Sequence, residues 1–192
     1  MWMGEKITEQ ERLTPMEIFK TPKGETVIDF GQNLTGYFEI KVNAKAGDRV
    51  SFSFAEVLDR DGNFYNENYR DAKARFEYIC KDGINTYKPK LAFWGFRYMR
   101  VDSFPCEITR DHINAIVVHS DMRRTGSFVC GDAKINQLYH NIIWGQKSNY
   151  LDIPTDCPQR DERLGWTGDT QAFCGTAAYN AMVDGFFHKW LQ

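Results

Sequence analysis

The chain has 192 residues, a formal charge of −2 at pH 7, and 42% hydrophobic, 26% charged and 15% aromatic residues. This composition excludes a disordered chain, a collagen-like chain and a small disulfide scaffold. Because basic residues are not in excess, nucleic acid is not an expected partner. No window approaches the roughly 18 consecutive apolar residues of a membrane-spanning helix, so no membrane partner is expected either.

The N-terminal 15 residues are charged and lack the apolar segment of a signal peptide, which predicts a cytoplasmic protein or a piece of a larger one. The five cysteines are Cys80, Cys106, Cys130, Cys157 and Cys174. Their odd number, wide spacing and lack of a C-x-x-C motif predict buried free thiols rather than a zinc site or a disulfide framework. The histidines show no metal-ligand spacing, so we expect no metal and no cofactor.

Apolar and polar residues alternate from about Val27 to Phe128, as they do in half-buried β-strands. The alternation is clearest in residues 38–42, 50–54 and 75–80. Turn sequences rich in Gly and Asp occur at 46–48, 61–63 and 81–83. Many short strands joined by such turns predict an antiparallel β-sandwich. The high aromatic content is consistent with a large β-rich core or with a sugar-binding surface.

The periodicity becomes helical after Gly131. Asp132 is a suitable N-cap for an amphipathic helix over 133–149, and a second helix is expected from Asp169 or Thr170 through Met182. An apolar, aromatic run continues to the last residues. So few helices cannot bury these faces, and we therefore expect the start of a larger helical domain and self-association through the exposed faces.

The segment between the two predicted helices, residues 152–169, contains two prolines and two glycines and fits no regular element. Its charged and aromatic residues include Asp156, Arg160, Asp161, Glu162, Arg163, Trp166 and Asp169. A charge run is usually a solvated surface, but this one is an ordered connection between helices and contains a tryptophan. Crowded carboxylates raise one another's pKa, and a protonated acid beside ionised ones is what glycosidases require.

Residues 156–173, DCPQRDERLGWTGDTQAF, resemble the signature of bacterial α-L-rhamnosidases of glycoside hydrolase family 78. Segments 29–36, 45–48 and 93–98 resemble the β-domain that precedes the catalytic barrel in that family. The resemblance implies an antiparallel, concanavalin-like (jelly-roll) β-sandwich, followed by the first helices of a truncated (α/α)6 barrel. We place a lead-in at 1–25, the sandwich at 26–125 and the incomplete barrel at 126–192.

The resemblance also implies release of terminal α-L-rhamnose with inversion, from a rhamnose-containing glycoside or oligosaccharide. Glu162 matches the general acid of the family. The residues that match the rhamnose subsite are Asp156, Arg160, Asp161, Trp166 and Asp169. An inverting enzyme also needs a carboxylate base, which in this family lies later in the barrel. We therefore expect this chain alone to have little or no hydrolase activity.

Two other functions remain open from the sequence. One is a carbohydrate-binding or structural β-sandwich module that carries a helical remnant. The other is a related (α/α)6 hydrolase that is specific for a different sugar.

Overall fold

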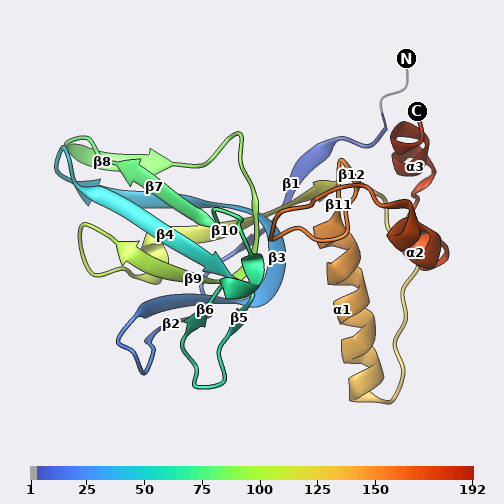
Figure 1. Cartoon of the computed structure of the whole chain (residues 1–192), viewed down its shortest axis with the longest axis horizontal. Coiled ribbons are helices and arrows are strands. Elements are labelled where there is room, and N and C mark those ends of the chain that lie inside the picture. Colours follow the sequence, from blue (N-terminus) through green and yellow to red (C-terminus); the bar gives the residue numbers. More distant parts are fainter. Residues whose placement is uncertain (1–3) are drawn as a thin grey trace. The chain divides into compact units, whose positions relative to one another are not determined.

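The computed structural model describes residues 4–192, which form antiparallel strands and three α-helices (Figure 1). The strands of the main sheet are β1 (Ile7–Leu13), β2 (Glu17–Lys20), β3 (Thr26–Ala44), β4 (Arg49–Ala55), β7 (Arg75–Ile79), β8 (Gly83–Tyr87), β9 (Trp94–Ser103) and β10 (Ile113–Ser120). A small hairpin is formed by β5 (Val57–Leu58) and β6 (Phe64–Tyr65), and short 3₁₀ turns occur at Glu67–Tyr69 and Arg110–His112. The chain divides into a sheet unit and a helical unit.

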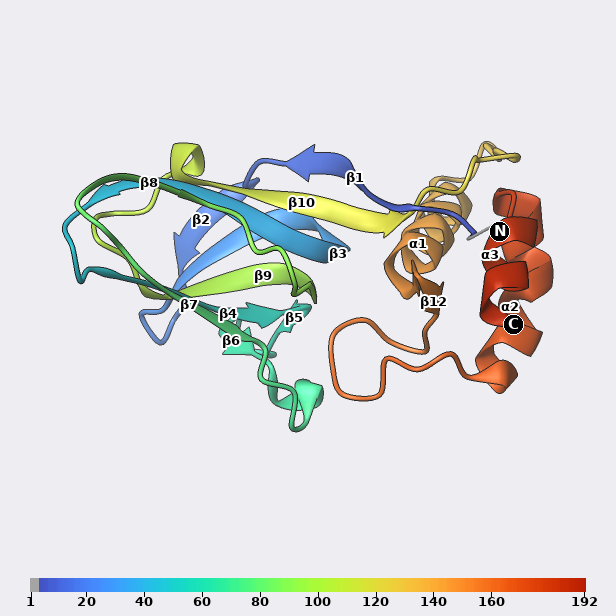
Figure 2. The ribbon, with the colours of Figure 1, turned by 90° about the horizontal axis from the view of Figure 1, so that it is seen from above.

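The long strand β3 organises the main sheet, whose order is β1-β10-β3-β9-β4-β7. Its first part pairs with β2 and β9, whereas its last part pairs with β10 and β8 (Figure 2). The register with β9 shifts between Asp29 and Leu34, and Gly31 within this irregularity has a φ of 75°, which favours glycine. The predicted antiparallel β architecture is thereby confirmed, in the form of one curled sheet.

The core of the sheet unit is built from aromatic residues at the apolar positions of the alternating pattern, which lie on the inner face of the sheet. The ring of Phe38 on β3 lies 5.4 Å from Phe52 and 4.8 Å from Phe76, both edge-on. Phe54 stacks on Trp94 with the ring centroids 4.5 Å apart. Phe38, Phe52 and Phe54 are fully buried, so these rings serve the core rather than a sugar-binding surface.

Two of the segments that carry the family resemblance meet inside the sheet. Arg97 on β9 donates hydrogen bonds from Nε and Nη2 to the two carboxylate oxygens of Asp29 on β3, each at 2.8 Å. The amide of Gly31 also donates to Asp29. The buried carboxylate is therefore satisfied by a two-point guanidinium contact, which stabilises the β3–β9 pairing.

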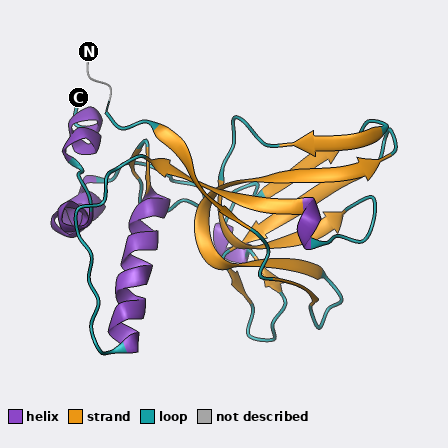
Figure 3. Ribbon diagram, turned by 180° about the vertical axis from the view of Figure 1, so that it is seen from behind, coloured by secondary structure: helices purple, strands orange, loops and turns teal. Residues whose placement is uncertain are grey.

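The helical unit contains α1 (Ala133–Asn149), α2 (Thr167–Asn180) and α3 (Asp184–Trp190) (Figure 3). A small hairpin of β11 (Tyr150–Leu151) and β12 (Ile153–Pro154) follows α1. The predicted limits of α1 are confirmed, and the Asp132 side chain accepts hydrogen bonds from the amides of the first turn. Helix α2 begins earlier than predicted, because Gly168 is accommodated in its first turn, where the helical hydrogen bonds have not yet begun.

The helical unit has a small core of its own around Tyr150. The core residues are Tyr150, Ala177, Ala181, Val183 and Phe186. Tyr150 stacks on Phe186 of α3 with the ring centroids 4.6 Å apart. A buried amide pair joins α1 to α2, since Asn180 donates to Gln146 at 2.9 Å.

Some features of the described residues differ from the sequence predictions. Residues 7–13 and 17–20, which lie in the predicted lead-in, are strands of the main sheet. All five cysteines are free as predicted, but only Cys80 and Cys157 are buried, whereas Cys106 and Cys174 are exposed. Within residues 4–192, no helix has the length and hydropathy needed to cross a membrane.

Candidate active site

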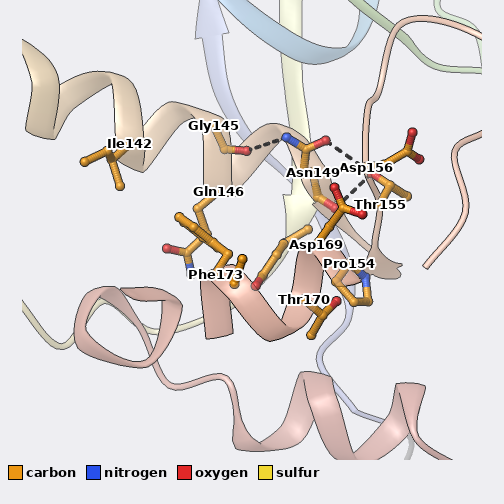
Figure 4. Close-up of a pocket in the computed structure, with 12 residues that line it drawn as sticks. Ile142, Gly145, Gln146, Asn149, Pro154, Thr155, Asp156, Asp169, Thr170 and Phe173 are labelled. Atoms are coloured by element: carbon orange, nitrogen blue, oxygen red, sulfur yellow. Dashed lines mark hydrogen bonds between the residues drawn. The ribbon is translucent and has the colours of Figure 1, made fainter. Parts of the chain in front are cut away.

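A pocket of about 330 Å³ opens between α1 and the start of α2 (Figure 4). It is lined by Ile142, Gly145, Gln146, Asn149, Tyr150, Pro154, Thr155, Asp156, Asp169, Thr170, Ala172 and Phe173. The pocket therefore brings together Asp156 and Asp169, two of the predicted sugar-subsite residues. Both are carboxylates, and Asp169 lies in the first turn of α2, where the helix dipole favours negative charge.

Asn149, the last residue of α1, ties the helix to the segment that leads to Asp156. Its side-chain amide donates to the carbonyl of Gly145 at 3.0 Å (Figure 4). Thr155 donates twice to the Asn149 carbonyl, from its amide at 2.9 Å and from its hydroxyl at 3.0 Å. These bonds fix the backbone immediately before Asp156, which places its carboxylate at the pocket wall.

Asp156 joins the two ends of the loop that follows it. The thiol of Cys157 donates to Oδ2 at 3.0 Å, and the backbone amide of Leu164 donates to Oδ1 at 3.3 Å. Inside this loop, Glu162 and Arg163 have φ values of 89° and 50°, in the left-handed region that side chains rarely adopt. Such backbone strain is often found at functional sites.

The Glu162 side chain lies beside Asp156. One side-chain oxygen or sulfur atom from each of Asp156, Cys157 and Glu162 lies within 4.8 Å of the other two. Burial raises the pKa of Cys157 to about 12, and the hydrogen bond to Asp156 and the charges of Asp156 and Glu162 act in the same direction. The Cys157 thiol therefore acts in this group as a hydrogen-bond donor to Asp156.

The remaining predicted site residues do not line the pocket. Glu162 is exposed to solvent, and Trp166, the residue before α2, is 46% exposed. Arg160 and Asp161 belong to the sheet unit. There, the Asp161 carboxylate lies 3.5 Å from the guanidinium of Arg70, in a partly exposed ion pair.

The loop tip, residues 159–161, packs closely on the sheet unit at Gly95. A Cβ atom on Gly95 would lie 2.9 Å from the Cβ and 3.0 Å from the Cα of Gln159. The Gly95 carbonyl also accepts a hydrogen bond from the Tyr69 hydroxyl at 2.7 Å. The glycine between Trp94 and Phe96 is therefore required by the close approach of the loop backbone.

Two pocket residues that the sequence analysis did not select carry unsatisfied hydroxyl groups. Among the described residues, the Tyr150 hydroxyl and the Thr170 hydroxyl are buried and make no hydrogen bond. Burial raises the pKa of Tyr150 to about 12. Nothing in the sequence marks Tyr150, because its burial depends on Phe173 of α2 and Phe186 of α3, which are distant in the chain.

The arrangement suits a small ligand rich in hydroxyl groups. Asp156 and Asp169 are acceptors for hydroxyl protons, and the amides of Gln146 and Asn149 line the same cavity. Glu162, exposed beside Asp156, adds a third carboxylate near this cavity. The described residues thus provide several hydrogen-bond acceptors around one pocket.

Comparison with protein families matches both parts of the chain. Residues 19–119 match the bacterial alpha-L-rhamnosidase concanavalin-like domain. Residues 123–192 match the bacterial alpha-L-rhamnosidase six-hairpin glycosidase domain. Together, these models cover nearly all of the described chain and include the whole of the loop between α1 and α2.

Curated and solved relatives agree with the family models. An alpha-L-rhamnosidase of Formosa agariphila is 44% identical over 169 residues, which are 86% of this chain and 18% of the relative. One from Alteromonas sp. is 42% identical over 95% of this chain and 20% of its own length. The crystal structure of the Streptomyces avermitilis enzyme complexed with L-rhamnose has a TM-score of 0.94 and 38% identity, covering 99% of this chain and 19% of that one. The Aspergillus terreus enzyme has a TM-score of 0.94 and 39% identity, covering 97% and 22%.

Proposed function

This chain belongs to the bacterial α-L-rhamnosidase family, and from that premise we propose that its loop 156–169 is the acid-bearing wall of a subsite for terminal α-L-rhamnose. The observation that carries the proposal is the grouping of Asp156 and Asp169 at one pocket, with Glu162 beside Asp156. A Streptomyces avermitilis relative that covers nearly the whole chain is a complex with L-rhamnose.

In the proposed reaction, Glu162 is the general acid that protonates the departing glycosidic oxygen. Asp156 and Asp169 accept hydrogen bonds from sugar hydroxyls, Trp166 offers an apolar face to the ring, and Arg160 and Asp161 complete the subsite. A water molecule activated by a second carboxylate attacks the opposite face of the ring, so the configuration inverts. This assignment follows the family pattern and uses no cofactor.

The chain spans about a fifth of the length of these curated relatives. We propose that the base carboxylate belongs to the remaining part of such an enzyme and that this chain alone does not hydrolyse p-nitrophenyl α-L-rhamnoside. Hydrolysis by the purified chain that is lost in Glu162→Gln would contradict this part of the proposal. A cytoplasmic location remains a prediction.

Isothermal titration calorimetry with L-rhamnose tests the binding part of the proposal. We expect the chain to bind L-rhamnose, and Asp169→Ala and Glu162→Ala each to weaken binding by about 10-fold or more, because each removes a hydrogen bond that involves a charged group. Asp71→Ala, which removes an exposed carboxylate from the sheet unit, is the matched control and should bind as the wild type does.

Two results would argue against this subsite. If L-rhamnose bound equally well to all the variants, the binding site would lie elsewhere, as in a carbohydrate-binding β-sandwich module. If the chain bound a different sugar through Asp169 and Glu162 and did not bind L-rhamnose, a related hydrolase specificity would be indicated instead.

A further inference from the structure

Cys157 is the most enclosed polar side chain of the candidate loop. The residue is 8% exposed, and its thiol points to the Asp156 carboxylate at 3.0 Å. Glu162 contributes an oxygen to the same small group. A buried thiol usually acts as a small hydrophobe, whereas the Cys157 thiol lies close to two carboxylates and donates a hydrogen bond to one of them.

The explanation lies in the way Asp156 closes the loop. One carboxylate oxygen accepts from the residue that follows Asp156, and the other accepts from the backbone amide of Leu164 at the far end of the loop. Without the Cys157 donor, the carboxylate would be less firmly oriented and would hold the Leu164 amide less well. The two donors together fix the carboxylate plane, and with it the segment that carries Glu162 in a strained backbone conformation.

We propose that the Cys157 thiol is a positioning residue, which fixes Asp156 by hydrogen bonding and thereby holds loop 157–164, with Glu162, closed against it. The consequence for sugar binding rests on the function proposed above. The consequence for the loop itself does not, because it concerns contacts within the ligand-free chain.

The role requires a donor that keeps its proton. The thiol pKa of about 12 means that Cys157 stays protonated at neutral pH, as a hydrogen-bond donor must. A thiolate in the same position would instead repel the adjacent carboxylates. A serine hydroxyl supplies an equivalent donor, whereas alanine supplies none, so these two substitutions separate hydrogen bonding from simple packing.

The direct test is hydrogen exchange of the Leu164 backbone amide, measured by NMR in the ligand-free chain. We expect Cys157→Ala to accelerate this exchange by about 10-fold, because a hydrogen bond to a charged group is lost, and Cys157→Ser to restore slow exchange. Cys174→Ala, which removes an exposed thiol from α2, is the control and should leave the exchange rate unchanged.

A second pair of variants covers the case in which the smaller side chain prevents folding. Cys157→Thr and Cys157→Val have nearly the same shape, but only threonine keeps a donor. Slow Leu164 exchange in the threonine variant and fast exchange in the valine variant would support the proposal. The proposal would be overturned if the Leu164 amide exchanged at the same rate in the serine and alanine variants and also at the same rate in the threonine and valine variants.

Affinity for L-rhamnose distinguishes a failure of this inference from a failure of the proposed function. If the wild-type chain did not bind L-rhamnose, the proposed function would fail, and the exchange measurements would still decide the role of Cys157. If the chain binds, we expect about 10-fold weaker binding by Cys157→Ala and recovery by Cys157→Ser. Unchanged affinity in Cys157→Ala would refute the positioning role in the subsite.

Discussion

Tyr150 shows how a single side chain can serve the core and the pocket at a cost in stability. Its ring is 3% exposed and stacks on Phe186, but its hydroxyl is buried without a hydrogen-bond partner among the described residues. An unsatisfied buried hydroxyl destabilises the folded state by roughly 1–3 kcal/mol. We expect Tyr150→Phe to keep the ring contacts and to raise the free energy of unfolding by about 1 kcal/mol, measured by urea denaturation.

Tyr139→Phe is the matched control for this prediction. The Tyr139 hydroxyl donates to the Gly126 carbonyl at 3.2 Å and accepts from Arg124 at 3.0 Å. Removing it should therefore lower the free energy of unfolding by about 1 kcal/mol. If Tyr150→Phe lowered the free energy of unfolding as much as Tyr139→Phe does, the Tyr150 hydroxyl would have to make a hydrogen bond in solution, which would contradict this prediction.

The same residue marks the limit of what could be predicted from the sequence about the site. Asp156, Asp169 and Glu162 were selected from the local pattern of charges and from the family motif, and the structure groups Asp156 with each of the other two. The contribution of Tyr150 depends on packing against distant residues such as Phe186, which no local pattern records. The catalytic role of Glu162 and the subsite roles remain predictions.

At the level of secondary-structure elements, regular periodicity and clear capping made prediction reliable. Helix α1 has helical apolar spacing and an Asp N-cap, and both of its predicted limits are confirmed. For helix α2 the sequence predicts a later start, because Gly168 has a low helix propensity, and a later end, at Met182 rather than Asn180. Strands β1 and β2 were not predicted, because the charged and polar residues of the lead-in do not alternate with a clear apolar face.

Substitution of Gly95 on β9 tests whether the loop tip, residues 159–161, packs on this strand. In Gly95→Ala, the new Cβ would lie 2.9–3.0 Å from three atoms of Gln159, two of which belong to its backbone. Because the backbone must shift to relieve this contact, we expect the free energy of unfolding to fall by about 1–3 kcal/mol. The amides of residues 159–161 should also exchange faster in the same variant.

A glycine with free space around it provides the control. Gly175 lies in α2 with no heavy atom within 4 Å of an added Cβ. Gly175→Ala should therefore stabilise the helix by up to about 1 kcal/mol, because alanine has the higher helix propensity. If Gly95→Ala were as well tolerated as Gly175→Ala, the loop tip would not pack on Gly95 in solution.

At the level of the whole molecule, the chain combines a curled antiparallel sheet with three helices, and one family model matches each of these two parts. The helical unit carries exposed apolar side chains, including Leu138, Tyr179 and Leu191. Self-association through such faces remains a prediction. The whole-chain resemblance was recognisable because the loop motif is long and specific, whereas composition alone indicated only a globular, β-rich protein.

The most direct test of the central claim is to titrate L-rhamnose into the isotope-labelled chain and to follow every backbone amide by NMR. The account predicts that the shifts concentrate in residues 156–170 and in the pocket face of α1, and that Asp169→Ala needs about 10-fold more sugar, or more, to reach the same shifts. Shifts confined to the strands of the sheet unit, or none at concentrations that saturate weak sugar sites, would contradict the assignment of this loop as the rhamnose subsite.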